Sequence, residues 1–436
     1  MKLGFYTVIA AQFFSSLADN ALLIAAIALL FQTVPDDASW MSPLLKWTFT
    51  LSYVLFAAFV GAVADALPKG RVMLITNGIK ILGCILLTVG VHPLAAYAVV
   101  GLGAAAYSPA KYGIMTEMLP PKQLVIGNSW MEAATVLSII FGVLLGGVLI
   151  DDRAALVLVD FFPGFVNTAP EAAMLVIMAA YLVAATINLF IPNTGVDHRM
   201  PSKKPTYLIK EFSRCCALLW RDRLGQISLA TTTLFWGAGA TLQFIVLDWA
   251  AHTLDYSLSQ ATRLQGVVAI GIAVGSVLAA KMISLRNSVK VLPLGALMGI
   301  LAMLMVLVND LKSAIVVLVI LGISAGIFVV PMNALLQHRG YILMGAGHSI
   351  AVQNFNENIG IMIMLSLYAL MLHSGLSVNA AIIIFGGFLT ATTLLVIVKH
   401  ARNQARGDSL HLIGMARPER RPPLVVPKKK KKRKKR

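Results

Sequence analysis

A stripe of polar side chains interrupts an otherwise apolar stretch near the start of the chain, residues 5–31. It consists of Gln12, Ser15, Ser16 and Asp19, with Asn20 at its edge. Spacings of three and four place these side chains on one face of a helix. The stretch is long enough to cross a bilayer, which takes about 20 apolar residues, so Asp19 falls near the midplane. A carboxylate there costs about 2.5–3.5 kcal/mol, and each Leu or Ile returns only about 0.3–0.6, so we expect this face to line protein or a wet cavity.

A second polar stripe lies in an apolar stretch of the C-terminal half. Ser349, Gln353 and Glu357 recur at intervals of four, and Asn354 and Asn358 lie on the adjoining row. The Glu357 carboxylate lies roughly 20 Å into the stretch, again near the middle of the membrane. The amides are equally consistent with contacts between helices, worth about 0.6 kcal/mol each on average. For Glu357 the cost of a carboxylate in hydrocarbon favours a cavity.

Four further charged residues fall inside apolar stretches, namely Lys80, Lys111, Glu132 and Asp248. Lys80 lies too deep to reach water easily, so we expect it to pair with Asp19 or Glu132. Lys111 lies near the inner end of its stretch, where its ammonium can also extend to the interface. Asp248 lies near an outer end, where water can solvate it. Separated positive and negative groups in one cavity suit a zwitterionic ligand.

The composition of the whole chain is that of a membrane protein. Of its 436 residues, 58% are hydrophobic and 13% are charged, against roughly 25% charged in soluble domains. Apolar stretches of spanning length recur from end to end without the alternation of barrel strands, which predicts an all-α polytopic membrane protein. The twelve predicted transmembrane helices are Phe5–Phe31, Pro43–Leu67, Arg71–Val91, Pro93–Met118, Leu124–Ile150, Ala172–Ile191, Gly225–Ala250, Gln265–Leu285, Val289–Val308, Ser313–Leu336, Met344–Leu372 and Val378–Val398.

The basic residues predict the orientation of these spans. Thirty of the 36 Lys and Arg residues fall in segments on the same side as the N-terminus. Four, counting Lys46 with the outer segments, fall on the other side. By the positive-inside rule, both termini are expected in the cytoplasm.

The longest internal polar segment divides the chain into similar halves. We expect a six-helix bundle over residues 1–192, a cytoplasmic linker over 193–224, a second six-helix bundle over 225–400 and a basic tail over 401–436. A proline deep in span four is matched by one deep in span ten, and each is followed by a polar span. These prolines are Pro109 and Pro331. A repeat of six plus six spans is the construction of the major facilitator fold, which binds substrate at midplane between the halves.

The linker and the tail each leave two interpretations open. In the linker, Leu208, Phe212, Cys215 and Leu219 recur at helical spacing, which fits either a solvated segment or a helix on the inner leaflet. The tail ends in a run of Lys and Arg that self-repulsion keeps disordered. It either stays solvated or binds anionic lipid of the inner leaflet, at about 1 kcal/mol per basic residue. Because no folded nucleic-acid-binding domain accompanies the basic tail, we do not expect nucleic acid as a partner.

No enzymatic motif accompanies these features. The sequence contains no P-loop, zinc motif or nucleophile elbow, so we expect no catalysis, no cofactor and no metal. Glycine pairs four residues apart recur, as at Gly271/Gly275 and Gly322/Gly326. Such pairs let neighbouring helices approach closely, and we interpret them as structural.

A short motif between spans two and three resembles the loop signature of the major facilitator superfamily. It comprises Gly61, Asp65, Lys69, Gly70 and Arg71, with two extra residues between the aspartate and the second glycine. The resemblance implies that Asp65 and Arg71 take part in a cytoplasmic gate. The fifth span lacks the proline of the antiporter signature, which argues against a drug/proton antiporter.

Longer stretches in both halves resemble the bacterial lysophospholipid transporters. They are Ala10–Gln12, Ala18–Leu23, Ala105–Ile114, Leu234–Gly239, Pro331–Gln337, Ala351–Asn354 and Glu357–Asn358. The resemblance implies movement of lysophospholipid, chiefly lysophosphatidylethanolamine, across the bacterial inner membrane to the cytoplasmic leaflet. It also implies that a cytoplasmic acyltransferase re-esterifies the product.

The same resemblance implies a set of substrate-binding residues. Those in matched stretches are Asp19, Asn20, Lys111, Tyr112, Asn333, Gln337, Gln353 and Glu357. The two polar stripes and the intramembrane charges add Gln12, Lys80, Glu132, Asn354 and Asn358. Gln243 stands where the resemblance implies an arginine, so binding of the phosphate is expected to fall to Lys111 or Lys80.

Two other functions are compatible with parts of this pattern. One is a proton-coupled exporter of amphipathic drugs, in which Asp19 or Glu357 titrates. The other is a non-transporting scaffold that recruits the acyltransferase through its basic loops, although a scaffold has no need of midplane carboxylates.

Overall fold

The computed structural model describes residues 3–35, 38–119, 121–151, 153–154, 157, 168–194, 205–344 and 346–407, without the side chains of 3, 38, 61–66, 116, 121–129, 132, 205 and 346–347. The described secondary structure is helical. The first group of helices is α1 (Leu3–Thr33), α2 (Ala38–Ala66), α3 (Lys69–Thr88), α4 (Pro93–Met118), α5 (Pro121–Leu149) and α7 (Ala169–Leu189). After α8 (Pro205–Arg221), the second group is α9 (Gly225–Leu254), α10 (Leu258–Met282), η1 (Leu285–Val291), α11 (Leu292–Leu304), η2 (Met305–Leu307), α12 (Leu311–Met344), α13 (Ala346–His373) and α14 (Val378–Ala405).

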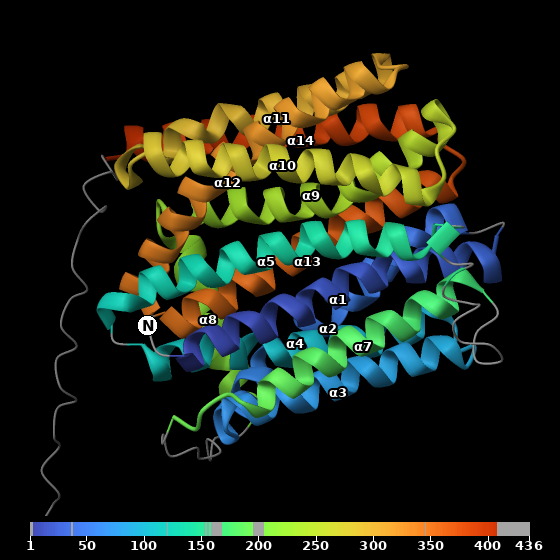
Figure 1. Cartoon of the computed structure of the whole chain (residues 1–436). Coiled ribbons are helices and arrows are strands. Elements are labelled where there is room, and N and C mark those ends of the chain that lie inside the picture. The colour runs from blue at the N-terminus through green and yellow to red at the C-terminus, as the bar shows by residue number, and fades with distance from the viewer. Residues whose placement is uncertain are drawn as a thin grey trace, which may run out of the picture.

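The long helices lie side by side in two bundles (Figure 1). In the first, α1 packs against α5 and α7, and α3 packs against α4 and α7. In the second, α10 packs against α12, α9 against α13, and α11 against α14. The main pairs that join the bundles are α2 with α13 and α5 with α10, and α2 also contacts α9. This is the expected all-α architecture of two helical bundles, and the domain boundaries given above stay predictions.

Ten helical segments in the described part of the chain are long and apolar enough to cross a membrane. Ten of the twelve predicted spans correspond to them. Helices α4 and α5 occupy the positions of predicted spans four and five but fall outside this group. The count of twelve spans therefore stays a prediction, as does the orientation. We call the ends expected to face away from the cytoplasm the outer ends.

Side chains at the helix starts explain where several helices begin. Ser257 and Gln260 form a reciprocal capping box at the start of α10, which satisfies two free backbone N–H groups. At the start of α9, Asp222 accepts hydrogen bonds from the backbone N–H groups of Leu224 (3.2 Å) and Gly225 (2.7 Å). The same carboxylate forms a two-pronged pair with the buried Arg339 of α12, at 3.0 and 2.6 Å. This pair fixes the inner end of α9 to α12.

The glycine pairs interpreted from sequence as structural lie where α10 and α12 approach closely. A Cβ added at Gly275 would collide with the backbone carbonyl oxygen of Ile323, and one at Gly322 would collide with that of Val268. Only glycine allows two backbones to come this near.

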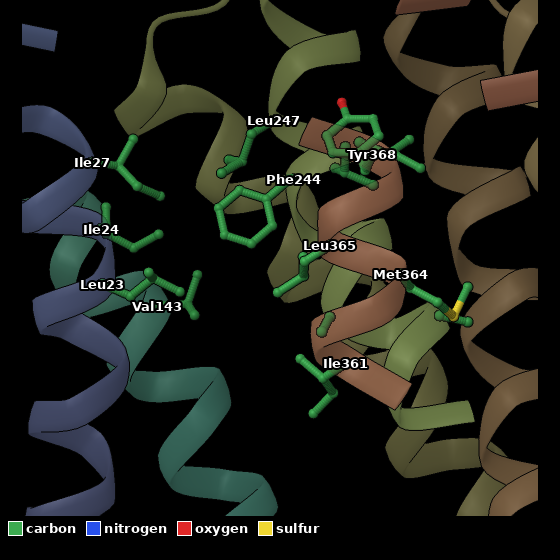
Figure 2. Packing of buried hydrophobic residues seen from close by; sticks show 14 of the residues in the cluster. Leu23, Ile24, Ile27, Val143, Phe244, Leu247, Ile361, Met364, Leu365 and Tyr368 are labelled. Atoms are coloured by element: carbon green, nitrogen blue, oxygen red, sulfur yellow. The ribbon is translucent and has the colours of Figure 1, made fainter. Parts of the chain in front are cut away.

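The largest apolar cluster is continuous across both bundles (Figure 2). The residues labelled there come from α1, α5, α9 and α13, with Leu23 and Val143 on one side and Phe244 and Leu365 on the other. Because the apolar contact runs across the boundary between the bundles, the two halves form one packed unit in this conformation.

The linker contains the predicted helix, α8. Its residues Phe212, Cys215 and Leu219 pack into a small cluster with α9 and α13 side chains, and Leu219 is fully buried. Trp220 donates to Asn356 of α13 at 3.0 Å. Most of the apolar face assigned from sequence to the leaflet therefore contacts protein instead, so contact between α8 and the leaflet stays a prediction. Residues 408–436, which carry the basic run, lie outside the described residues.

Candidate functional site

The first polar stripe leads to a buried ion pair inside the first bundle. The Lys80 ammonium on α3 lies 2.7 Å from Asp19 Oδ2 on α1. The Lys80 side chain is 2% exposed and that of Asp19 is 17% exposed. The prediction that Lys80 pairs with an intramembrane acid is confirmed, and Asp19 is that acid.

Other polar groups of the first bundle form hydrogen bonds with both members of this ion pair. Tyr181 on α7 donates to Asp19 Oδ1 at 2.6 Å. Lys80 also donates to Ser15 at 2.9 Å, and Ser15 donates to Asn77 at 2.7 Å. The ammonium lies over the ring of Tyr181, 5.5 Å from its centroid. Because these partners come from α1, α3 and α7, the pair joins three helices of one bundle.

The second polar stripe forms a separate cluster in the other bundle. Gln353 Nε2 donates to Glu357 Oε1 at 2.8 Å and to Asn333 Oδ1 of α12 at 3.2 Å. Glu357 and Gln353 are 7% and 8% exposed. In contrast, Asn358 uses its amide to donate to the carbonyl of Asn354 one turn earlier, at 2.7 Å. Glu357, Gln353 and Asn333 are thus brought together as expected, while Asp19 lies in the other bundle.

The remaining predicted residues are scattered around these two clusters. Gln12 donates to Thr135 of α5 at 3.2 Å, and Asn20 donates to the carbonyl of Ser16 at 2.8 Å. The buried Lys111 lies over the Tyr112 ring, 4.6 Å from its centroid. Two further residues, Gln337 and Arg71, are exposed.

Two predicted residues cannot be placed in these clusters. The side chains of Glu132 and Asp65 lie outside the described residues. Among the side chains that are described, no group of three or more His, Cys, Asp or Glu is arranged to hold a metal ion.

A cavity of about 160 Å³ lies where α5 of the first bundle meets the second bundle. Its walls are apolar and include Val143 of α5, Phe235 of α9, Ala269 of α10 and Phe385 of α14. The volume is below the roughly 300–1,000 Å³ of small-molecule pockets, so it fits part of an apolar chain rather than a whole lipid.

Two glutamines provide the polar part of this cavity, and sequence reasoning identified only one of them. Gln243 of α9 and Gln265 of α10 both line it, and Gln265 Nε2 donates to the backbone carbonyl of Gln243 at 3.0 Å. Lys46 of α2 donates to Gln243 Oε1 at 3.3 Å. From sequence Lys46 was assigned to the outer segments, but the structure places it inside α2, where it reaches across to the other bundle. No sequence motif indicated this contact.

Further cross-bundle contacts join the outer ends of the helices. Ser259 of α10 donates to Asp151, just beyond α5, at 3.2 Å. The rings of Trp40 on α2 and His373 on α13 lie 4.6 Å apart. The cavity therefore lies beside an outer boundary that is held closed by polar and aromatic contacts.

The arrangement of two helical bundles around an apolar cavity defines a membrane carrier, and comparison with known proteins agrees. The model of the Major Facilitator Superfamily matches residues 8–364. A single-substitution mutant of the nucleoside transporter NupG superposes with a TM-score of 0.68 at 13% identity, covering 91% of this chain and 99% of that one. A bacterial homologue of the human lysosomal transporter Spinster, inward-facing and occupied, superposes with a TM-score of 0.64 at 15% identity, covering 92% and 95%. At such identities these likenesses concern the fold alone.

Sequence similarity is closer to one group of carriers. The lysophospholipid transporter LplT of Yersinia pestis (strain Pestoides F) is 41% identical over 374 residues, covering 86% of this chain and 88% of the relative. The same name and values apply to the relative in Yersinia pseudotuberculosis (serotype O:3, strain YPIII). The chain belongs to the Major Facilitator Superfamily and, within it, to the family of these lysophospholipid transporters. The resemblance described from sequence is confirmed.

Proposed function

We propose that this protein moves lysophospholipids, chiefly lysophosphatidylethanolamine, across the bacterial inner membrane to the cytoplasmic leaflet. The observation that carries the proposal is the cavity between the bundles, which combines apolar walls with an amide pair. A lysophospholipid has the matching parts, one apolar chain and one zwitterionic head. The relatives' name supports this substrate class.

The cavity's position supports entry of the acyl chain from the side. Its walls include Val143 of α5 from one bundle and Gly266 of α10 from the other, so separating these helices would open it toward lipid. A Cβ added at Gly266 would lie 3.1 Å from Leu144 Cδ2 of α5. The acyl chain can then stay in an apolar medium while the head group crosses, which avoids the cost of burying it unpaired.

For the ammonium of the head group we propose the acidic and amide cluster around Glu357, because a carboxylate can bind it by charge-assisted hydrogen bonds. Asp19, Asn20, Tyr112 and the other members of the predicted set stay candidates for the same path.

The test is flipping of fluorescent lysophosphatidylethanolamine in proteoliposomes, measured by dithionite quenching of the outer leaflet. Cysteines introduced at Leu144 and Gly266, in a chain whose native cysteines are replaced by serine, allow α5 to be linked reversibly to α10. Linking should stop flipping, and reduction should restore it. Undiminished flipping in the linked protein would refute side entry at this position. A wild-type rate no faster than protein-free vesicles would refute the function.

A protonophore distinguishes this proposal from a proton-coupled exporter of amphipathic drugs. Flipping that is indifferent to the protonophore fits a flippase, whereas collapse of transport fits coupling to protons. We also propose that a cytoplasmic acyltransferase re-esterifies the flipped lipid, which requires that the protein release the lipid on the cytoplasmic side.

A further inference from the structure

The Lys46 ammonium of the first bundle lies beside the polar end of the cavity between the bundles. Lys46 lies about 12 Å along α2 from its first residue, at 1.5 Å per residue, so it is inside the membrane segment rather than in a loop. Its ammonium donates to Gln243 Oε1 at 3.3 Å, and Gln243 lines the cavity. Lys46 therefore lies directly behind the polar end of the cavity wall.

This ammonium has no carboxylate partner in the described part of the protein. The ion pairs found there join Lys69 to Glu117, Lys80 to Asp19 and Arg339 to Asp222. Lys46 is held by a neutral amide oxygen instead. An amide oxygen carries no net charge, so it compensates a partly buried ammonium less than a carboxylate or phosphate does.

Of the two lysines favoured from sequence for the phosphate, Lys80 differs in this respect. Lys80 is occupied by the Asp19 carboxylate at 2.7 Å inside the first bundle. Gln243, where the resemblance implies an arginine, carries no charge. The cation beside position 243 is thus supplied by α2 of the opposite bundle.

We propose that Lys46 binds the phosphate of the substrate head group, a role that rests on the transport function proposed above. A phosphate oxygen at the cavity's polar end replaces Gln243 Oε1 as the acceptor of the Lys46 hydrogen bond. That bond joins α2 to α9 across the outer boundary, so binding of phosphate also removes one of the contacts that hold the boundary closed. The substrate thereby loosens the outer ends as it enters.

The test compares two lipids that share one acyl chain, lysophosphatidylethanolamine and the monoacylglycerol that lacks phosphate. Binding to the purified full-length protein is measured by quenching of tryptophan fluorescence. Lys46→Gln should weaken binding of the phospholipid roughly 10- to 100-fold, the range expected for one hydrogen bond to a charged group. Binding of monoacylglycerol should not change, which also checks that the variant is folded.

Three further variants sharpen the result. Lys46→Arg should keep most of the affinity, because it keeps the cation. The double variant Lys46→Gln/Gln243→Arg, which moves the cation across the boundary, should recover phosphate binding. Lys312→Gln, the same change at an exposed lysine at the outer end of α12, should have no effect.

The outcomes separate this proposal from the transport function. If the wild type prefers the phospholipid and Lys46→Gln keeps that preference, the role of Lys46 is overturned and the transport function stands. Equal loss for both lipids in Lys46→Gln would make the residue a structural contact and also overturn the proposal. If the wild type binds neither lipid, the transport function itself is overturned.

Discussion

Replacing Asp19 by asparagine tests whether the buried ion pair of the first bundle stabilises the fold. The variant keeps the size of the side chain but leaves the Lys80 ammonium, 2% exposed, without its carboxylate. Breaking a buried pair by removing one partner costs about 3–5 kcal/mol. Ser15 and the Tyr181 ring still contact the ammonium, so we expect a loss toward the lower limit, about 3 kcal/mol. That corresponds to a more than 100-fold shift of the unfolding equilibrium.

The measurement is equilibrium unfolding in mixed micelles, followed by circular dichroism as sodium dodecyl sulfate is added. The double variant Asp19→Asn/Lys80→Met removes both charges and should regain most of the lost free energy of unfolding, since no uncompensated ion remains. A single variant within about 0.5 kcal/mol of wild type, or a double variant no more stable than the single, would refute this reasoning. Loss of flipping without loss of stability would instead place Asp19 on the substrate path.

Three other experiments give independent tests. Glu357→Ala should lower flipping of lysophosphatidylethanolamine at least tenfold with normal expression, and an unchanged rate would remove Glu357 from the substrate path. Gly275→Leu should lower the free energy of unfolding by about 1–3 kcal/mol or more, because the new side chain would collide with the Ile323 carbonyl. The control Gly387→Ala should not lower it, because the space at its Cβ is open. Equal stability of the two variants would contradict the packing. Burial raises the pKa of Cys216 to about 11. Because maleimide reacts with the thiolate, the rate of Cys216 labelling should rise about tenfold per pH unit between pH 7 and 9. A labelling rate that reaches a plateau in that range would contradict the raised pKa.

The sequence was most informative where the physics is local. Apolar length and helical spacing predicted the ten helical segments that are long and apolar enough to cross a membrane, and both polar stripes, because a helix in lipid must satisfy its own backbone. The cost of a bare charge in hydrocarbon predicted that Lys80 pairs with an acid. Glycine spacing predicted that some helices approach closely, as the glycines of α10 and α12 do. None of these inferences required knowing which helices are neighbours.

The tertiary structure decided which polar groups meet. From sequence, Asp19 and Glu357 were expected to face protein or a cavity, but their partners could not be decided; the structure pairs Asp19 with α3 and α7 in one bundle and brings the Glu357 cluster into contact with α12 in the other. It also assigned Lys46 to the outer segments, although that side chain reaches α9. Periodicity fixes the face of a helix on which a side chain lies, but not the helix that this face meets. That choice depends on packing between segments as distant in sequence as those of Trp40 and His373, more than three hundred residues apart, which no local pattern records.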